Sequence, residues 1–104
     1  MAFADISSRT AILQAMDEFD RRGRTAFLKE HSFGKARRYF LEHEGRLYDS
    51  KAIVGVAHAY QFPALGPLTS GEFSGGDQTV REKLEALGFT VRVLPRLPTI
   101  APVV

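Results

Sequence analysis

Asp49 and Lys51, an acid followed two positions later by a lysine, come closest in this sequence to the residues of a hydrolytic site. In metal-dependent nucleases a carboxylate in this pattern holds Mg²⁺, and the lysine polarises the phosphate that is attacked. Such a site needs a further acid on an adjoining strand, whereas the nearest acids, Glu42 and Glu44, fall in an expected hairpin loop. The structural alternative is that Asp49 caps a helix, where an acid suits the positive end of the helix dipole. We expect this capping role and predict no catalytic residue in the chain.

Histidine and cysteine do not form a recognisable metal site. Cysteine is absent, and His31, His43 and His58 are separated by twelve and fifteen residues, unlike the close pairs typical of zinc sites. Asparagine is also absent, so the chain cannot contain a His-Asn-His nuclease site. His58 follows Lys51 by seven residues, which places both on the same non-core face of an expected helix. We predict no cofactor and no metal, and His58 is either a structural residue or one that contacts a ligand.

Ser74, Gly75 and Gly76 precede an expected helix, where their backbone N–H groups could bind an anion. They lack the Lys-Ser or Lys-Thr that follows in nucleotide-binding loops, and the neighbouring Asp77 would repel a phosphate. Helix capping is the simpler interpretation, and anion binding is the alternative.

Positive charge is concentrated in one segment. Residues 21–38 hold seven basic residues and one acid, a local balance of +6 in a chain of net charge +2. Residues 1–20 sum to −3, and residues 39–104 sum to −1. Such a segment attracts polyanions such as nucleic acid, although a solvated helix face and loop has the same composition.

These residues must be positioned by a single domain, because the chain has 104 residues, of which 44% are hydrophobic and 25% are charged. Ser8 is expected to cap a helix that begins at Arg9 and ends near Gly23. The expected buried face of this helix comprises Ile12, Leu13, Met16 and Phe19. A short helix over Thr25–His31 should follow.

Two short aromatic-rich runs, Arg38–Leu41 and Arg46–Tyr48, flank the polar residues Glu42–Gly45. This pattern is typical of a β-hairpin. The strand Phe89–Val93, which alternates with period two, should pair with the hairpin.

Two more helices are expected in the second half of the chain. Asp49 or Ser50 should cap a helix over Lys51–Gln61, and a helix that opens at residues 74–76 should end at Gly88. Their core faces comprise Ile53, Val56, Ala57 and Tyr60 in the first helix and Val80, Leu84 and Leu87 in the second. The predicted fold is α+β, a small antiparallel sheet (the hairpin plus the C-terminal strand) packed with about four helices, and a winged helix is one such arrangement.

Pro95, Pro98 and Pro102 lie close together at the end of the chain. We therefore expect a domain over residues 1–93 and a proline-rich tail or linker over residues 94–104. No apolar run approaches the roughly 18 residues of a membrane span, and the N-terminus lacks the pattern of a signal peptide. We expect a cytoplasmic protein without a membrane partner.

Several short stretches, taken together, resemble one protein family. They are Ala36-Arg37-Arg38-Tyr39-Phe40-Leu41, Gly45-Arg46-Leu47-Tyr48-Asp49-Ser50-Lys51-Ala52-Ile53, Ala57-His58-Ala59-Tyr60-Gln61, Pro67-Leu68, Phe73-Ser74-Gly75-Gly76, Thr79-Val80 and Leu87-Gly88-Phe89. From about Phe3 to Val93, the chain is similar to the N-terminal head domain of McrA-like, modification-dependent His-Asn-His restriction endonucleases. The resemblance implies a DNA-binding module that helps to recognise a modified base. Cleavage would belong to a separate nuclease domain, in the same chain or in a partner.

The resemblance and the basic segment together predict the residues that contact DNA. They are Lys35, Arg37, Arg38, Tyr39, Arg46, Tyr48, Ser50, Lys51, His58, Ser74, Gly75, Gly76 and Thr79. Arginine and lysine would contact phosphates, and aromatic rings could stack on a base displaced from the duplex. The predicted function is to read double-stranded DNA that carries a methylated base, 5-methylcytosine or N6-methyladenine. No residue pattern distinguishes these modifications from a phosphorothioate.

Two other functions stay open. The small, nearly neutral remainder of the chain and its proline-rich tail suit a protein-interaction or dimerisation module that positions a nuclease partner, in which case the chain could form a homodimer. The third function is a metal-dependent hydrolase built on Asp49 and Lys51.

Overall fold

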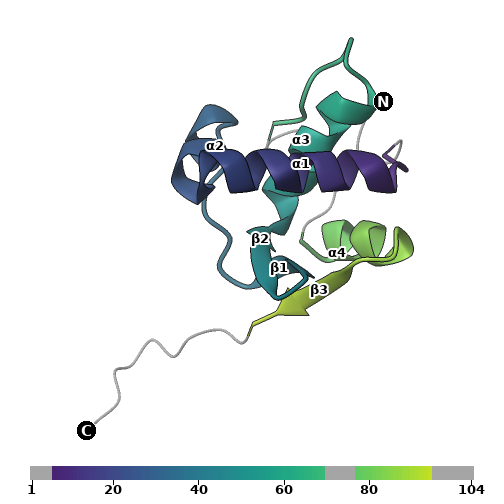
Figure 1. The fold of residues 1–104 in the computed structure, drawn as a ribbon. Helices are drawn as coiled ribbons and strands as arrows, with labels where there is room; N and C mark the ends of the chain where they lie inside the picture. The colour runs from purple at the N-terminus through teal and green to yellow at the C-terminus, as the bar shows by residue number, and fades with distance from the viewer. Residues whose placement is uncertain (1–5, 70–76, 95–104) are drawn as a thin grey trace, which may run out of the picture.

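The computed structural model describes residues 6–69 and 77–94 of the chain (Figure 1). Four helices and three strands follow one another in these residues. They are α1 (Arg9–Arg22), α2 (Arg24–Glu30), β1 (Tyr39–His43), β2 (Arg46–Asp49), α3 (Ser50–Gln61), α4 (Asp77–Ala86) and β3 (Thr90–Val93). The predicted α+β fold, with the hairpin and a C-terminal strand in one antiparallel sheet, is confirmed.

Local signals set both ends of α1, as predicted. The Ser8 hydroxyl accepts a hydrogen bond from the Ala11 backbone N–H at 3.0 Å, and Gly23 ends the helix with a φ of 88°. The predicted core face is wrong at Leu13, which is 38% exposed, whereas its other three members are buried. Ala15 is buried in place of Leu13. The buried face is therefore turned slightly from the predicted one.

A two-residue turn joins β1 to β2. Glu44 and Gly45 have φ values of 51° and 81°, and two successive positive angles are what a type I′ hairpin turn requires. The predicted loop over residues 42–45 is therefore too long, because Glu42 and His43 continue β1.

β1 is the central strand of the sheet, whose order is β2-β1-β3. Its residue Leu41 lies opposite Tyr48 of β2 and opposite Val91 of β3, and all three side chains are buried. Figure 1 shows α1 lying across α3, with the sheet below them and α4 beside β3. The core therefore lies between the inner face of the sheet and the helices.

Helix α3 is enclosed on nearly all sides. Every residue from Ala52 to His58 is buried, because α1, α4 and the sheet all contact this helix. A Cβ added at Gly55 would lie 2.6 Å from the Phe33 Cζ and 2.9 Å from the Leu68 carbonyl oxygen. The missing side chain at Gly55 thus permits close packing of Phe33 and Leu68 against α3.

The predicted core residues of α4 also lie against the core. Val80 and Leu84 are fully buried, and Leu87 is partly buried. Gly88, with a φ of 90°, ends the helical region before β3. The expected helix opening at residues 74–76 and the tail after residue 94 lie outside the described residues, so the division into domain and tail stays a prediction. None of the helices described in residues 6–69 and 77–94 is long and apolar enough to cross a membrane.

Candidate functional site

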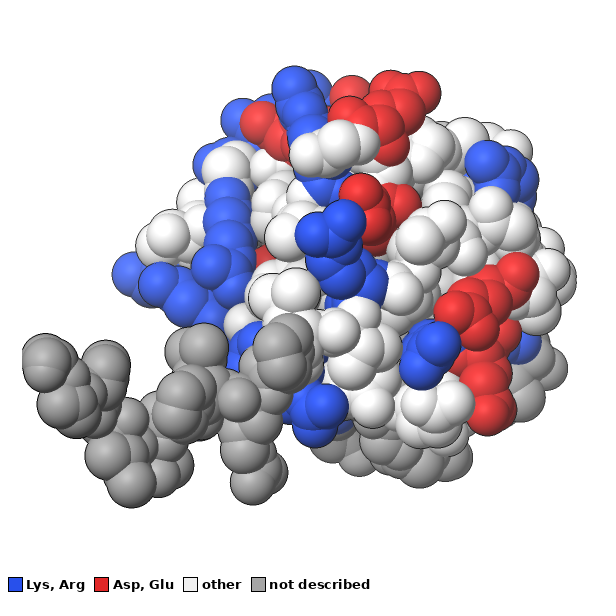
Figure 2. All heavy atoms as spheres, turned by 90° about the horizontal axis from the view of Figure 1, so that it is seen from below, with Lys and Arg blue, Asp and Glu red and all other residues white. Residues whose placement is uncertain are grey.

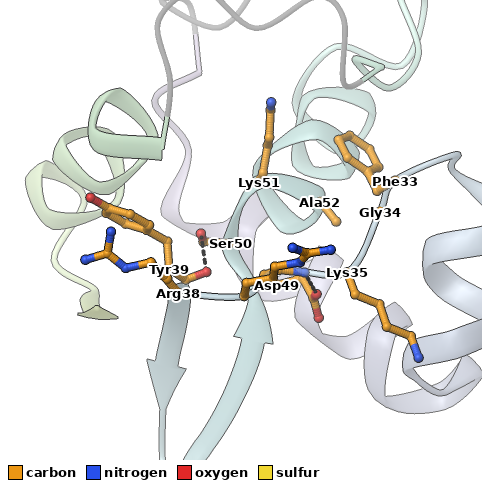
Figure 3. Close-up of a pocket in the computed structure, with 11 residues that line it drawn as sticks. Phe33, Gly34, Lys35, Arg38, Tyr39, Asp49, Ser50, Lys51 and Ala52 are labelled. Atoms are coloured by element: carbon orange, nitrogen blue, oxygen red, sulfur yellow. Dashed lines mark hydrogen bonds between the residues drawn. The ribbon is translucent and has the colours of Figure 1, made fainter. Parts of the chain in front are cut away.

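A surface hollow of about 390 Å³ lies between the segment that leads into β1 and the first turn of α3 (Figure 3). These two parts of the chain are neighbours because Phe40, near the start of β1, lies opposite Asp49 at the end of β2. Several of the residues predicted to contact DNA line the hollow, namely Lys35, Arg37, Arg38, Tyr39, Ser50 and Lys51. The hollow is completed by Phe33, Gly34, Ala36, Asp49 and Ala52.

Asp49 is the N-cap residue of α3, as predicted, but its side chain makes no capping hydrogen bond to the helix. Its carboxylate is almost fully buried and accepts hydrogen bonds from Arg24 Nε at 2.8 Å and from Arg24 Nη2 at 2.9 Å. The same carboxylate accepts a hydrogen bond from the Ala36 backbone N–H at 2.7 Å. The hydrogen bond to Asp49 raises the pKa of Arg24. The Asp49 carboxylate therefore accepts hydrogen bonds from residues distant in the sequence and not from the first turn of α3.

The segment over residues 33–39 is held at several further points. The buried Phe33 ring packs against Gly55, and the Ser50 hydroxyl donates a hydrogen bond to the Tyr39 carbonyl at 3.1 Å. Arg38 and Leu94 are joined twice, because the Leu94 N–H donates to the Arg38 carbonyl at 2.7 Å and Arg38 Nε donates to the Leu94 carbonyl at 3.0 Å. These contacts hold the backbone beneath the basic side chains at several points.

Six of the seven cations of the basic segment, all but Lys29, fall into two groups. The first three arginines form ion pairs, which are Arg21 with Asp17, Arg22 with Glu18 and Arg24 with Asp49. By contrast, Lys35, Arg37 and Arg38 are exposed and form no ion pair with any residue that the structure describes. Seen from below the view of Figure 1, many of the Lys and Arg side chains gather on one side of the surface (Figure 2). The positive potential of the segment is therefore concentrated at the hollow.

Arg46 and Tyr48, which were predicted to contact DNA, lie elsewhere. Tyr48 is 3% exposed, and its hydroxyl donates a hydrogen bond to Asp20 at 3.0 Å. Arg46 forms an ion pair with the same carboxylate at 3.0 Å. Burial, followed by the hydrogen bond to Asp20, raises the pKa of Tyr48. Tyr48 cannot stack on a base from this position, because its ring is part of the core.

These two residues line a second hollow, of about 450 Å³, at the turn end of the hairpin. Its other lining residues are Leu13, Met16, Asp17, Asp20, His43 and Glu44.

The expectation that His58 lies with Lys51 on a non-core face of α3 is wrong. His58 is 2% exposed, its Nδ1 lies 2.7 Å from the Gly66 carbonyl oxygen, and its ring packs against Phe62. The physical reason is that the segment after α3 folds back over this helix, which sequence periodicity does not show. Thr79 is half-buried in α4 and does not line the first hollow. Ser74, Gly75 and Gly76 lie outside the described residues.

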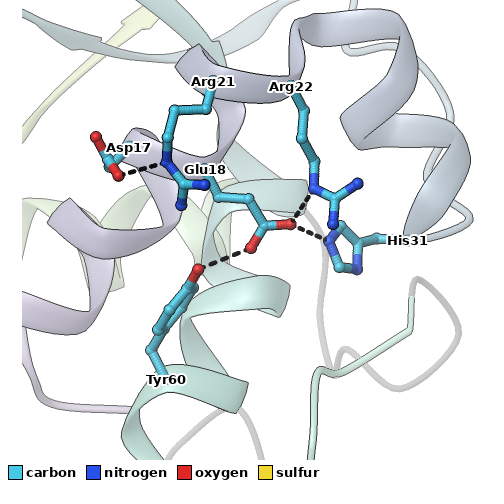
Figure 4. A network of polar contacts seen from close by, with 6 residues as sticks. All are labelled: Asp17, Glu18, Arg21, Arg22, His31 and Tyr60. Atoms are coloured by element: carbon cyan, nitrogen blue, oxygen red, sulfur yellow. Dashed lines mark hydrogen bonds and ion pairs between the residues drawn. The ribbon is translucent and has the colours of Figure 1, made fainter.

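A polar cluster around Glu18 was not predicted (Figure 4). The nearly buried Glu18 carboxylate accepts a hydrogen bond from the Tyr60 hydroxyl at 2.8 Å, forms an ion pair with Arg22 at 2.9 Å and lies 2.8 Å from His31 Nε2. Burial alone raises the pKa of Glu18, but the contacts with His31, Tyr60 and Arg22 outweigh it and leave the pKa lowered. The spacing of Glu18 and Arg22 is the only sequence signal for this cluster, which ties α1 to α2 and α3.

Comparison with known protein families gives a match over residues 4–93 to the ScoMcrA-like N-terminal head domain. The chain belongs to this family. The resemblance inferred from short sequence stretches is thereby confirmed. No curated protein sequence matches the chain.

The head domain is also similar to a solved structure, that of the Type IV phosphorothioation-dependent restriction endonuclease ScoMcrA. The two share 43% sequence identity over 86% of this chain, with a TM-score of 0.62. This chain spans only 13% of that protein.

The described part of the head domain offers no metal site. In residues 6–69 and 77–94, no three His, Asp or Glu side chains are grouped as metal ligands. Both oxygens of Asp49 already accept hydrogen bonds from Arg24, and one also accepts from Ala36. Asp49 therefore lacks the free carboxylate that the metal-dependent hydrolase hypothesis requires.

Proposed function

We propose that this chain is a non-catalytic head domain that binds double-stranded DNA for a modification-dependent restriction endonuclease. The observation that carries the proposal is the hollow itself, where exposed Lys35, Arg37 and Arg38 stand on a fixed backbone beside Lys51. Cleavage would come from a nuclease domain elsewhere in the same chain or in a partner. Family membership supports this division of labour, since ScoMcrA is a far longer protein that is named as an endonuclease.

The DNA backbone is the part of the ligand that suits this site. Lysine and arginine on a surface neutralise phosphates and release counterions, and this gives affinity without sequence selectivity. Tyr39 lines the same hollow and could supply a stacking contact, with the Arg38 guanidinium 5.8 Å from its ring centroid. Ser50 adds a hydroxyl, which already donates to the Tyr39 carbonyl.

The modification that the whole protein reads is a separate question. Tyr48 and His58 are buried, so fewer side chains of this chain can reach a base than the sequence led us to expect. A methylated base, either 5-methylcytosine or N6-methyladenine, stays our prediction. A phosphorothioate is the alternative, because ScoMcrA is described as a phosphorothioation-dependent restriction endonuclease.

A salt series of binding measurements tests the proposal. Duplexes of one sequence that are unmodified, methylated at either base or phosphorothioated would be compared by fluorescence anisotropy at one stated salt concentration and then across salt concentrations. If three or four of the cations at the hollow contact phosphate, log K against log salt should fall with a slope of about −2.7 to −3.6. Absence of binding to every duplex at low salt, or an affinity that does not depend on salt, would refute DNA binding.

A dimerisation or protein-interaction function is the second candidate, and exposed apolar side chains favour it. Leu13 is 38% exposed and lines the second hollow, and Leu47 on the edge strand β2 is 42% exposed. Light scattering at high protein concentration tests this candidate, and a monomer would count against a homodimer.

A further inference from the structure

Asp49 is the one acid among the described residues that line the first hollow, where the charged side chains are otherwise the four cations Lys35, Arg37, Arg38 and Lys51. We infer that Asp49 is a positioning residue for DNA binding, and that it acts through Arg24 and the Ala36 backbone rather than by touching DNA. The inference rests on the proposed function and names residues that the bound phosphates would not contact.

The contacts around Ala36 form a clamp on the basic segment. Asp49 accepts the Ala36 N–H at 2.7 Å, while Arg24 Nη2 donates to the Ala36 carbonyl at 3.4 Å. Arg24 and Asp49 hold each other through two hydrogen bonds of 2.8 and 2.9 Å, the two-point geometry in which Arg–carboxylate pairs are strongest. Both polar groups of the Ala36 backbone are thus fixed by one ion pair. We name this arrangement the Ala36 clamp.

The clamp lies between two of the cations that the hollow presents. Lys35 and Arg37 flank Ala36 directly in the sequence. The chain from Ser32 to Arg38 belongs to no helix or strand, so regular backbone hydrogen bonding does not fix it. In Figure 3 Lys35 and Arg38 extend to opposite sides of Asp49, which holds the backbone between them. Fixing this backbone during folding lowers the entropy that is lost when DNA binds, which is the physical basis of preorganisation.

Two possible effects of Asp49 on DNA affinity, repulsion of phosphates by its charge and positioning of the basic segment, have opposite signs and can therefore be told apart. A negative charge near bound phosphates is repulsive, so its removal should leave DNA affinity unchanged or raise it slightly. If Asp49 positions Lys35 and Arg37, its removal should instead lower DNA affinity although the protein becomes more positive.

The experiment compares Asp49→Asn with Glu30→Gln by fluorescence anisotropy, with an unmodified duplex at about 0.1 M salt. Both variants lose one negative charge, and Glu30 is the only acid in the basic segment and belongs to no part of the clamp. We expect Asp49→Asn to bind about tenfold more weakly with a salt slope lower by about one, which corresponds to the loss of one phosphate contact. Glu30→Gln should bind as tightly as the wild type or up to about twofold more tightly.

Arg24→Lys provides a second variant in case Asp49→Asn does not fold. It keeps the positive charge but loses the two-point contact with Asp49, so it should also weaken DNA binding. Hydrogen exchange of the Ala36 amide should become faster in both variants, and their melting temperatures show that each is folded at the temperature of the binding assay.

The outcomes separate the inference from the proposed function. Folded Asp49→Asn and Arg24→Lys that bind DNA as tightly as the wild type would overturn the inference and leave the proposed function standing. Wild-type protein that binds no duplex at low salt would overturn both.

Discussion

The two hollows of this domain each contain a tyrosine, arginine and acid, but they differ in their balance of charge and in how the charges are paired. The first combines Tyr39 and four cations with one acid, Asp49, while the second combines Tyr48 and Arg46 with the three acids Asp17, Asp20 and Glu44. In the first hollow the acid is paired with Arg24, and three exposed cations remain. In the second hollow, Asp20 forms an ion pair with Arg46 and accepts a hydrogen bond from the Tyr48 hydroxyl.

The difference shows that basic and aromatic residues do not by themselves make an anion site. The ability to bind an anion depends on whether nearby acids already form ion pairs with the cations. At the first hollow Asp49 forms its ion pair with Arg24 of α2. The exposed lysine and arginines of the hollow are therefore left without an ion pair among the described residues. This comparison predicts that the two hollows respond differently to substitution.

The largest effect should come from removing two cations of the first hollow together. Lys35→Ala with Arg37→Ala should weaken DNA binding by up to about a hundredfold at 0.1 M salt and lower the salt slope by about two, since each phosphate contact contributes about one. The charge-matched control is Arg21→Ala with Arg46→Ala, because both of these arginines form ion pairs with aspartates. Equal losses of affinity in the two double variants, measured by anisotropy, would mean that only total charge matters.

Gly55→Ala should destabilise the domain by about 1–3 kcal/mol, the usual cost of inserting a methyl group into a packed core. The new Cβ would meet Phe33 Cζ at 2.6 Å, and Phe33 belongs to the first hollow. Thermal or denaturant unfolding measures the loss of stability. Amide chemical shifts should change around residues 33–39 and not around Asp20. A variant with unchanged stability would show that the Phe33 ring and the Leu68 carbonyl can both move aside without cost.

Glu18→Gln should lower stability by about 1–2 kcal/mol at neutral pH, because a nearly buried carboxylate loses charge-assisted hydrogen bonds. The pKa of Glu18 is lowered in the folded protein, so its contribution is complete above the ordinary carboxyl pKa and is lost as pH falls through the lowered value. The difference in unfolding free energy between wild type and variant should therefore shrink as pH falls below about 4.5.

Denaturant titrations across this pH range measure the effect of Glu18. DNA affinity at pH 7 should stay within about twofold of the wild type, because Glu18 lies outside both hollows. A difference in stability that does not depend on pH would contradict the ionised role of Glu18.

Asp20→Asn should produce the smallest effect, and in the opposite direction. Without the negative charge Arg46 loses its ion pair, while an amide oxygen can still accept the Tyr48 hydroxyl. DNA binding should become about two- to threefold tighter, and the salt slope should steepen by less than one. An unchanged affinity would mean that the second hollow lies too far from the bound duplex for Arg46 to contribute.

Local signals were sufficient to predict most of the fold. Ser8 and Gly23 set the two ends of α1 through interactions within a few residues. The Glu44-Gly45 turn depends only on the backbone angles of its own residues. Such features depend on neighbours in the sequence, so residue type and spacing reveal that they exist, although the predicted hairpin loop over residues 42–45 is too long. The prediction fails at Leu13, where packing against α3 decides which way the helix faces.

The candidate site was only partly predictable, because it depends on contacts between distant residues. Asp49 has the local preference of a helix cap, but Arg24, 25 residues earlier, and Ala36 compete successfully for its carboxylate. His58 is buried because residues 62–68 fold back over α3, and nothing in the helical period indicates this. The hollow itself follows from the strand register, which brings the segment before β1 beside the end of β2.

The double connection between Arg38 and Leu94 has a mechanical consequence. β3 runs antiparallel to β1, so the chain leaves the sheet at the end where β1 begins and where the first hollow lies. Tension applied to the polypeptide after Leu94 would be borne first by its two hydrogen bonds with Arg38 and then by the β1–β3 ladder. If a domain were attached there, force between it and this domain would act on Arg38, a cation proposed to contact DNA. Tension on the chain after Leu94 would therefore be transmitted directly to a DNA contact.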